Sequence, residues 1–142
     1  MEIKLLTSYT PQELEDLKVL LSLLSDKLEL TEEHLKTLVN DSHSRLYVIY
    51  SDEKRIIGCA TLCILHTLEG NMGNIEDVVI SSNYRGQHLG RKLMEHVLRE
   101  AKQYAPIQLH LTSNPRRIAA NNLYPSLHFE KKETNVYQLL IP

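Results

Sequence analysis

The sequence predicts a mixed α/β fold of the α+β class, and three patterns support this prediction. Leucines recur at helical spacing near the N-terminus, apolar runs separated by polar turns fill the middle, and a long amphipathic segment then joins two strand-like runs. The predicted order of elements is β-α-α-β-β-β-α-β-α-β-β.

Two helices are expected near the N-terminus, after a short strand over residues 3–7. The run Thr10-Pro11-Gln12-Glu13 is a capping box with proline at the first helical position, and it predicts a helix over Pro11–Leu24. A second, shorter helix is expected to begin after Thr31 and to end near Asn40-Asp41.

The middle of the chain predicts an antiparallel meander. Residues 45–51 and 56–66 flank a polar turn, which is typical of a hairpin, and a loop containing Gly70 and Gly73 leads to a strand over residues 74–80. A long amphipathic helix is expected over residues 86–104. The strand expected at residues 107–112 should run parallel to 74–80, because a helix joins the two.

The C-terminal part predicts a helix and a final hairpin. Asn114-Pro115 repeats the cap-and-proline start signal and opens a helix expected to run to about Leu127, with Pro125 kinking or shortening its last turn. Residues 129–134 and 136–141 form the expected hairpin. The last strand is apolar, and an exposed edge of that kind is usually paired or covered.

Length and composition limit the classes of function. With 142 residues, 42% hydrophobic and 24% charged, the chain is expected to form one domain over residues 1–142. A net charge of -2 without a basic stripe argues against a nucleic-acid partner. No apolar run suggests a signal peptide or a membrane span, so a cytoplasmic protein with no membrane partner is expected. Cys59 and Cys63 lie too far apart along one strand for a disulfide and are expected to be buried, reduced thiols.

The most informative stretch runs from the strand at residues 74–80 through a glycine-flanked turn into the long helix. The first N–H groups of a helix lack partners and lie at the positive end of its dipole, so they accommodate phosphate oxygens. Gly86 and Gly90 would let the backbone approach such a ligand, and Arg85 adds a charge. The spacing is not G-x-G-x-x-G, which argues against a dinucleotide. The alternative is that the glycines serve only as a helix breaker and a packing position.

This turn resembles the coenzyme A pyrophosphate loop of the GNAT superfamily of N-acetyltransferases, which follows the pattern Q/R-x-x-G-x-G/A. Arg85 fills the first position and Gly90 the last, whereas His88 stands where the pattern has glycine. The resemblance implies a phosphate-binding loop for acetyl-CoA.

Two further runs extend the resemblance over about the C-terminal half of the chain. Glu76-Asp77-Val78-Val79 followed by Arg85-Gly86 looks like the corresponding run in glucosamine-6-phosphate N-acetyltransferases. Ala119-Ala120-Asn121-Asn122-Leu123-Tyr124 followed by Leu127-His128-Phe129 looks like the superfamily's final motif, with His128 in place of glycine.

The resemblance implies a fold and a cofactor site. The fold would be a single GNAT domain with a mixed, mostly antiparallel sheet of about six to seven strands, flanked by about four helices and splayed at its central parallel pair. Acetyl-CoA would be the co-substrate, and the protein would form a homodimer. The residues implied to bind it are Val78, Val79, Ile80, Arg85, Gly86, Gln87, His88, Leu89, Gly90, Arg91, Asn114 and Asn121.

Acetyl transfer to an amine requires a base for the amine, a donor for the oxyanion and a proton for the departing thiolate. The resemblance implies Glu76 as the base, directly or through water, and Tyr124 as the general acid. It also implies a bulge whose N–H groups, from Val78 and Ile80, bond the thioester carbonyl and the pantetheine arm. A solvated strand start at Glu76 and an ordinary half-buried core position for Tyr124 are the alternatives.

The expected acceptor is a primary amine of a small molecule, with an amino-sugar phosphate as the first guess from the run at residues 76–85. Residues 21–40 and the loop at 66–73 are expected to receive it. A peptide or protein amine, a polyamine and an aminoglycoside remain alternatives, as does a non-catalytic acyl-CoA-binding regulatory module. No metal-ligand spacing and no nucleophile motif is present, so direct transfer without a metal is expected.

Overall fold

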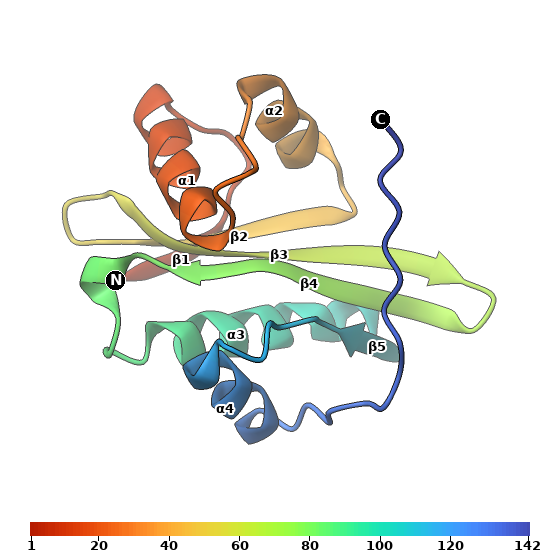
Figure 1. Cartoon of the computed structure of the whole chain (residues 1–142). Helices are drawn as coiled ribbons and strands as arrows, with labels where there is room; N and C mark the ends of the chain where they lie inside the picture. Colours follow the sequence, from red (N-terminus) through yellow and green to blue (C-terminus); the bar gives the residue numbers. More distant parts are fainter. The chain divides into compact units, whose positions relative to one another are not determined.

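The structure is a computed structural model that describes residues 1–142. The chain divides into two compact units, Met1–Thr112 and Ser113–Pro142, and each is described by itself. The first unit contains the sheet and helices α1 to α3, and the second contains helix α4 (Figure 1).

A five-stranded sheet forms the centre of the first unit. Its strands, in spatial order, are β1 (Glu2–Leu5), β2 (Ser44–Tyr50), β3 (Ile56–Thr67), β4 (Gly70–Ile80) and β5 (Ile107–His110). The first four pair antiparallel, and β5 lies parallel to β4. The predicted α+β class and mixed, mostly antiparallel sheet are confirmed.

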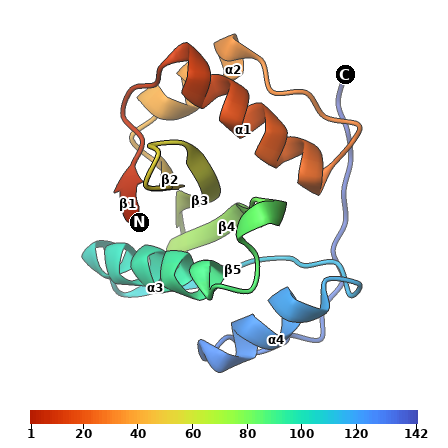
Figure 2. The ribbon, with the colours of Figure 1, turned by 90° about the vertical axis from the view of Figure 1, so that its left-hand side faces the viewer.

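Helices cover both faces of this sheet. Helices α1 (Pro11–Leu24) and α2 (Glu32–Asn40) lie on one face and α3 (Leu89–Ala101) lies on the other, as the end-on view shows (Figure 2). The predicted capping box of α1 is confirmed, since Thr10 Oγ1 accepts from the N–H of Glu13 at 3.1 Å and Glu13 Oε1 accepts from the N–H of Thr10 at 2.8 Å.

The core between α1, α2 and the sheet is leucine-rich. Leu20 and Leu35 are each 1% exposed, and they pack in one cluster with Val48 and Val79. Asp16, buried on α1, accepts hydrogen bonds from the Arg55 guanidinium and from the N–H of Ile56. These bonds fix α1 against the β2–β3 turn, and so they fix one wall of the candidate site.

The predicted splay between β4 and β5 is also confirmed. Pairing runs only from Asn71 opposite Ile107 to Asn74 opposite His110. The second half of β4, residues 75–80, therefore continues past the end of β5. It leads through the 3-10 turn Ser82–Tyr84 into the loop before α3.

The second unit consists of α4 (Ile118–Ser126) and irregular chain. Asn114 does not cap this helix as predicted. Its side-chain oxygen instead accepts from the N–H of Arg116 at 2.9 Å, forming a tight turn that delays the helix to Ile118. Pro125 lies in the last turn, and the helix ends one residue later, which confirms the predicted shortening.

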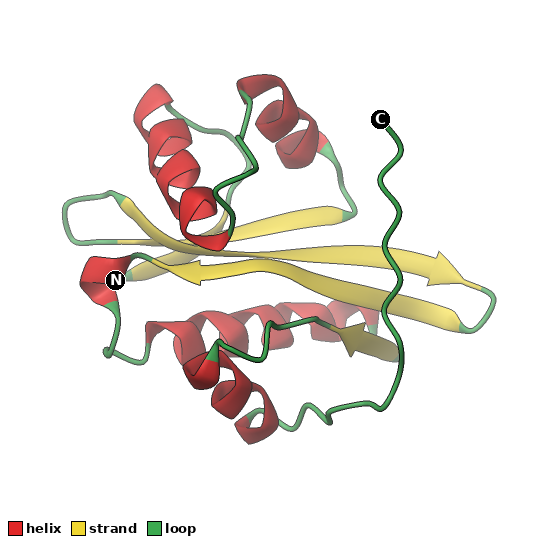
Figure 3. Ribbon diagram, in the orientation of Figure 1, coloured by secondary structure: helices red, strands yellow, loops and turns green.

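Three other predictions are corrected. Residues 127–142 contain no strand, so the final hairpin and the count of six to seven strands were wrong (Figure 3). A strand needs a partner for its backbone, and an apolar run alone supplies only propensity. The predicted loop around Gly70 is the start of β4, so Glu76 lies within the strand instead of at its start. Helix α3 begins at Leu89 because Gly86 and His88 have φ values of 80° and 59°, which a right-handed helix excludes.

Candidate active site

An open cavity of about 400 Å³ lies between α1, the α1–α2 connection, α2 and the strands β3 and β4. Half of its lining residues are leucines, and the lining includes no lysine and no arginine. The leucines are Leu17, Leu21, Leu24, Leu28, Leu30, Leu35, Leu38 and Leu46, and the polar or ionisable lining residues are Glu29, His34, Cys59, Thr61, Cys63, Glu76 and Asp77.

A β-bulge in β4 shapes the polar end of this cavity. Thr61 lies opposite Glu76 and Cys59 lies opposite Val79, so β4 takes three steps where β3 takes two. The extra residue falls at Asp77, whose φ of 55° is left-handed. Glu76, Asp77 and Val79 consequently line one cavity, although strict alternation would place Glu76 on the face opposite Asp77 and Val79. The bulge implied by the resemblance is present at the expected position.

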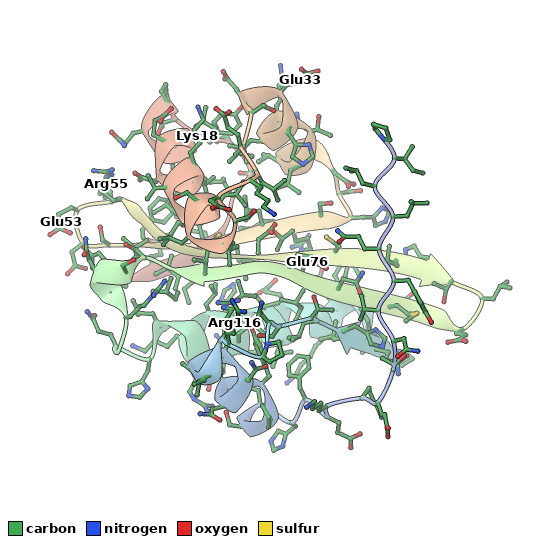
Figure 4. All side chains as sticks on the ribbon, viewed as in Figure 1. Lys18, Glu33, Glu53, Arg55, Glu76 and Arg116 are labelled. Atoms are coloured by element: carbon green, nitrogen blue, oxygen red, sulfur yellow. The ribbon has the colours of Figure 1, made fainter.

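The two carboxylates of the bulge influence each other. Burial against the surrounding protein raises the pKa of Glu76, and the nearby charge of Asp77 raises it further. Burial also raises the pKa of Asp77, with His34 acting in the opposite direction. Both side chains remain accessible to water through the open cavity. Glu76 is labelled on β4 in Figure 4. The cavity therefore favours a cationic ligand.

Both cysteines beside the carboxylates are free thiols. Cys59 is buried and donates to the carbonyl oxygen of Asp77 at 3.4 Å. Burial, and then the charge of Asp77, raise the pKa of its thiol to about 12. Burial and the two acids also raise the pKa of Cys63, which is only partly buried. Neither thiol is therefore ionised at neutral pH.

The predicted phosphate loop joins β4 to α3. With His88 at the N-cap position, no side chain caps the first turn of α3. Arg85 folds back so that its Nε donates to the carbonyl oxygen of Ile80 at 3.4 Å. A Cβ on Gly86 would meet nothing within 4 Å, so its positive φ, and not crowding, favours glycine there.

The remaining loop and strand residues of the predicted site also lie in the first unit. Arg91 pairs with Glu95 at 3.5 Å on the first turns of α3, and the side chain of Leu89 is buried. The others are Val78 and Val79 in β4, Gln87 in the loop and Gly90 in α3.

The predicted residues of the second unit cluster around α4. The Asn121 side-chain amide donates to the carbonyl oxygens of Asn114 at 2.9 Å and of Arg117 at 3.0 Å. The ring of Tyr124 packs edge-on against Phe129, with 6.0 Å between centroids. Burial raises the pKa of Tyr124, opposed by Arg117, so the phenol keeps its proton at neutral pH.

Asp77 and Thr61 line the cavity but were missing from the predicted site. The sequence signal for Asp77 is an acidic pair that interrupts an apolar strand, which strict alternation does not explain. Thr61 could have been found only from its register with Glu76 across β3 and β4. Its side chain is 2% exposed, and its hydroxyl has no hydrogen-bond partner.

No helix has the length and apolar character needed to cross a membrane. No group of three or more His, Cys, Asp or Glu side chains is arranged to hold a metal ion.

Residues 10–129 match the acetyltransferase (GNAT) family, and the chain belongs to this family. It is therefore an N-acetyltransferase by family, and membership implies acetyl-CoA as the acetyl donor.

Solved structures share the fold over nearly the whole chain. A putative acetyltransferase from Agrobacterium tumefaciens has a TM-score of 0.83 at 20% identity, covering 99% of this chain and 100% of that one. An aminoglycoside acetyltransferase from an uncultured soil metagenomic sample has a TM-score of 0.79 at 19% identity, covering 99% and 96%. A ribosomal-protein-alanine N-acetyltransferase from Brucella melitensis biovar Abortus 2308 has a TM-score of 0.76 at 15% identity, covering 99% and 100%. At these identities the similarity defines the GNAT fold and leaves the acceptor open.

Proposed function

We propose that this protein transfers an acetyl group from acetyl-CoA directly to the primary amine of a small molecule. The observation that carries the proposal is the β4 bulge, where the carboxylates of Glu76 and Asp77 line one small-molecule cavity. The same strand leads directly into the candidate phosphate loop. The proposal therefore combines an amine-binding end and a coenzyme-binding end on one strand and its following loop.

The loop before α3 suits the diphosphate of coenzyme A. The first turn of α3 has no side-chain cap, so its N–H groups and the positive end of the helix dipole suit an anion. Arg85 adds a positive charge at the start of this loop. In the proposal, residues 85–91 hold the diphosphate. Val78, Val79 and Ile80 bind the thioester and pantetheine arm, and Asn114 and Asn121 contribute from the second unit.

Glu76 is the proposed base. It takes one proton from the entering ammonium, directly or through water, because its raised pKa makes it a better acceptor than an ordinary carboxylate. The new C–N bond forms as the thioester C–S bond breaks, and the nitrogen gives its second proton to solvent. Tyr124 gives a proton to the departing sulfur and recovers one from solvent. Each turnover thus yields an amide, a free thiol and one net proton.

Direct transfer is favoured over a covalent acyl-enzyme. A cysteine nucleophile must be a thiolate, and the pKa of both Cys59 and Cys63 is raised. The two carboxylates beside them oppose ionisation further. An attacking amine therefore has no competing thiolate in this cavity.

The role of Tyr124 requires residues 1–142 to act as one catalytic domain, and we include this in the proposal together with a cytoplasmic location.

We also propose a homodimer. Its support is the apolar C-terminal tail, where Val136 is 74% exposed and Leu140 is 83% exposed. Sedimentation equilibrium of the full chain and of a chain ending at Asn135 tests this. We expect a dimer and a monomer, respectively, and a monomeric full chain would contradict the dimer.

Free-thiol release from acetyl-CoA over an amine panel tests the proposed reaction. The panel includes glucosamine 6-phosphate, which the run at residues 76–85 favours, and spermidine. An aminoglycoside and an alanyl peptide are added because two structural relatives are named for such acceptors. Tight binding of acetyl-CoA without thiol release for any amine would favour the non-catalytic binding module instead.

A further inference from the structure

We infer that the acceptor is a primary amine with an apolar body, an arylalkylamine or alkylamine. Its ammonium lies against Asp77, Glu76 and the Thr61 hydroxyl, and its body lies among the cavity leucines. This inference rests on the proposed function, since it specifies the substrate class of the same site.

The first observation that supports an apolar amine is the charge of the cavity lining. Glu29, Glu76 and Asp77 are its carboxylates, and the lining includes one histidine, His34, but no lysine or arginine. An ammonium group would pair with the acidic end. A phosphate group would enter the same cavity without a lysine or arginine to pair with, which is unfavourable for an anion removed from water.

The second observation is that the hydroxyl of Thr61 has no hydrogen-bond partner. This side chain is buried, lies directly opposite Glu76 across β3 and β4, and lines the cavity. Its hydroxyl has no hydrogen-bond partner within the protein. Buried polar groups are normally paired, and a hydroxyl can accept from an N–H donor. An ammonium between Thr61 and the bulge carboxylates would supply this partner.

The third observation is the set of leucines that line the cavity. Leu17, Leu35 and Leu46 are buried, whereas Leu28 is 65% exposed at the opening. An apolar ligand body would remove this leucine surface from water. The leucines offer the hydroxyls of a sugar no hydrogen-bond partner, and Glu29 is the only lining carboxylate outside the bulge that the second ammonium of a polyamine could meet. The volume of about 400 Å³ suits a small molecule.

The test compares 2-phenylethylamine with glucosamine 6-phosphate and spermidine as acceptors for the full-length protein. We expect kcat/KM for 2-phenylethylamine to exceed that for either other amine at least tenfold. A tenfold ratio corresponds roughly to the free energy of one charge-assisted hydrogen bond. Calorimetry of 2-phenylethylamine binding, without acetyl-CoA, gives a readout independent of turnover.

Matched variants locate the bound amine. Asp77→Asn removes the charge, and asparagine tolerates the left-handed backbone. We expect it to raise KM for 2-phenylethylamine about tenfold while kcat changes less than threefold. Thr61→Val should raise KM severalfold without lowering Tm, because it removes an unpaired hydroxyl. Leu28→Ser should raise KM severalfold. Leu23→Ser, on an exposed leucine of α1 outside the cavity, should leave KM unchanged.

The outcomes separate this inference from the proposed function. If glucosamine 6-phosphate or spermidine matches or exceeds 2-phenylethylamine, the apolar-amine inference is overturned and acetyl transfer stands. If no amine releases thiol but 2-phenylethylamine binds and Asp77→Asn weakens that binding, the cavity assignment is supported and the transferase proposal fails. Absence of both binding and turnover for 2-phenylethylamine overturns the inference.

Discussion

Glu76 and Asp77 are neighbours in the sequence, yet both line the same cavity, because the β-bulge at Asp77 interrupts the alternation of β4. The left-handed φ of 55° at Asp77 is the local backbone feature behind this arrangement. Two acids with different roles can therefore act on one ligand, Asp77 as an anchor for the ammonium and Glu76 as the base.

Replacing the proposed base tests the division of roles. Glu76→Gln keeps the size of the side chain and removes its basicity, so we expect kcat to fall roughly 100-fold with little change in KM. In the wild type, kcat/KM should fall as the pH drops through the raised pKa of Glu76, since the base becomes protonated. Steady-state kinetics between pH 5 and 9, as an approximate working range, should show this acidic limb in the wild type and not in the variant. Glu69→Gln, exposed in the β3–β4 turn, is the matched control.

The bulge acids should also reduce stability. Burial raises the pKa of Asp77 above its ordinary value of 3.8, so the folded state holds its proton more tightly than the unfolded chain. Stability should therefore fall as pH rises from 3.8 through the raised pKa. Asp77→Asn should raise Tm at neutral pH and have little effect below the ordinary pKa. Thermal denaturation across pH measures this, and a lower Tm for the variant at neutral pH would contradict it.

Tyr124 should matter for turnover more than for folding. Tyr124→Phe keeps the ring contact with Phe129 and removes the acidic proton. We expect kcat to fall roughly 10- to 100-fold while Tm changes little. Tyr137 is 88% exposed and lies in the same unit, so Tyr137→Phe is the matched control. Equal activity of the two variants would remove Tyr124 from the proposed mechanism.

His88 and His128 stand where the family patterns have glycine, and both adopt left-handed conformations, with φ of 59° and 73°. Relief of this strain outweighs the extra freedom that glycine gives the unfolded chain, so each His→Gly change should stabilise the protein by roughly 0.5 to 1 kcal/mol. His88→Ala, which keeps a Cβ at the same φ, should not stabilise. Urea denaturation of the three variants tests this, and stabilisation by His88→Ala would show that the strain is not the cause.

Local sequence signals predicted helix α1 to the residue. Thr10 and Glu13 predicted the start of α1 because a capping box depends only on neighbours within one turn. The polar turn at residues 52–54 and the parallel β4–β5 pair followed from equally local patterns and from the handedness of crossover connections.

Features that depend on distant partners were not predictable from the sequence. Val136 and Leu140 have the composition of a strand, but a strand also needs a neighbour, and none pairs with them. The resemblance implied the β4 bulge, but the residues of β4 alone do not show that this bulge places Asp77 in the cavity. The unpartnered hydroxyl of Thr61 depends on the residues packed around it in the fold, which the local sequence does not reveal.

The most direct test of the central claim is acetyl-CoA-dependent release of free thiol by the purified protein with 2-phenylethylamine, with the acetylated amine identified by mass spectrometry. We predict one N-acetylated product per thiol released, with turnover reduced roughly 100-fold in Glu76→Gln. Equal rates in the wild type and Glu76→Gln, or thiol release without an N-acetylated product, would contradict the assignment of the β4 bulge as the amine-activating site.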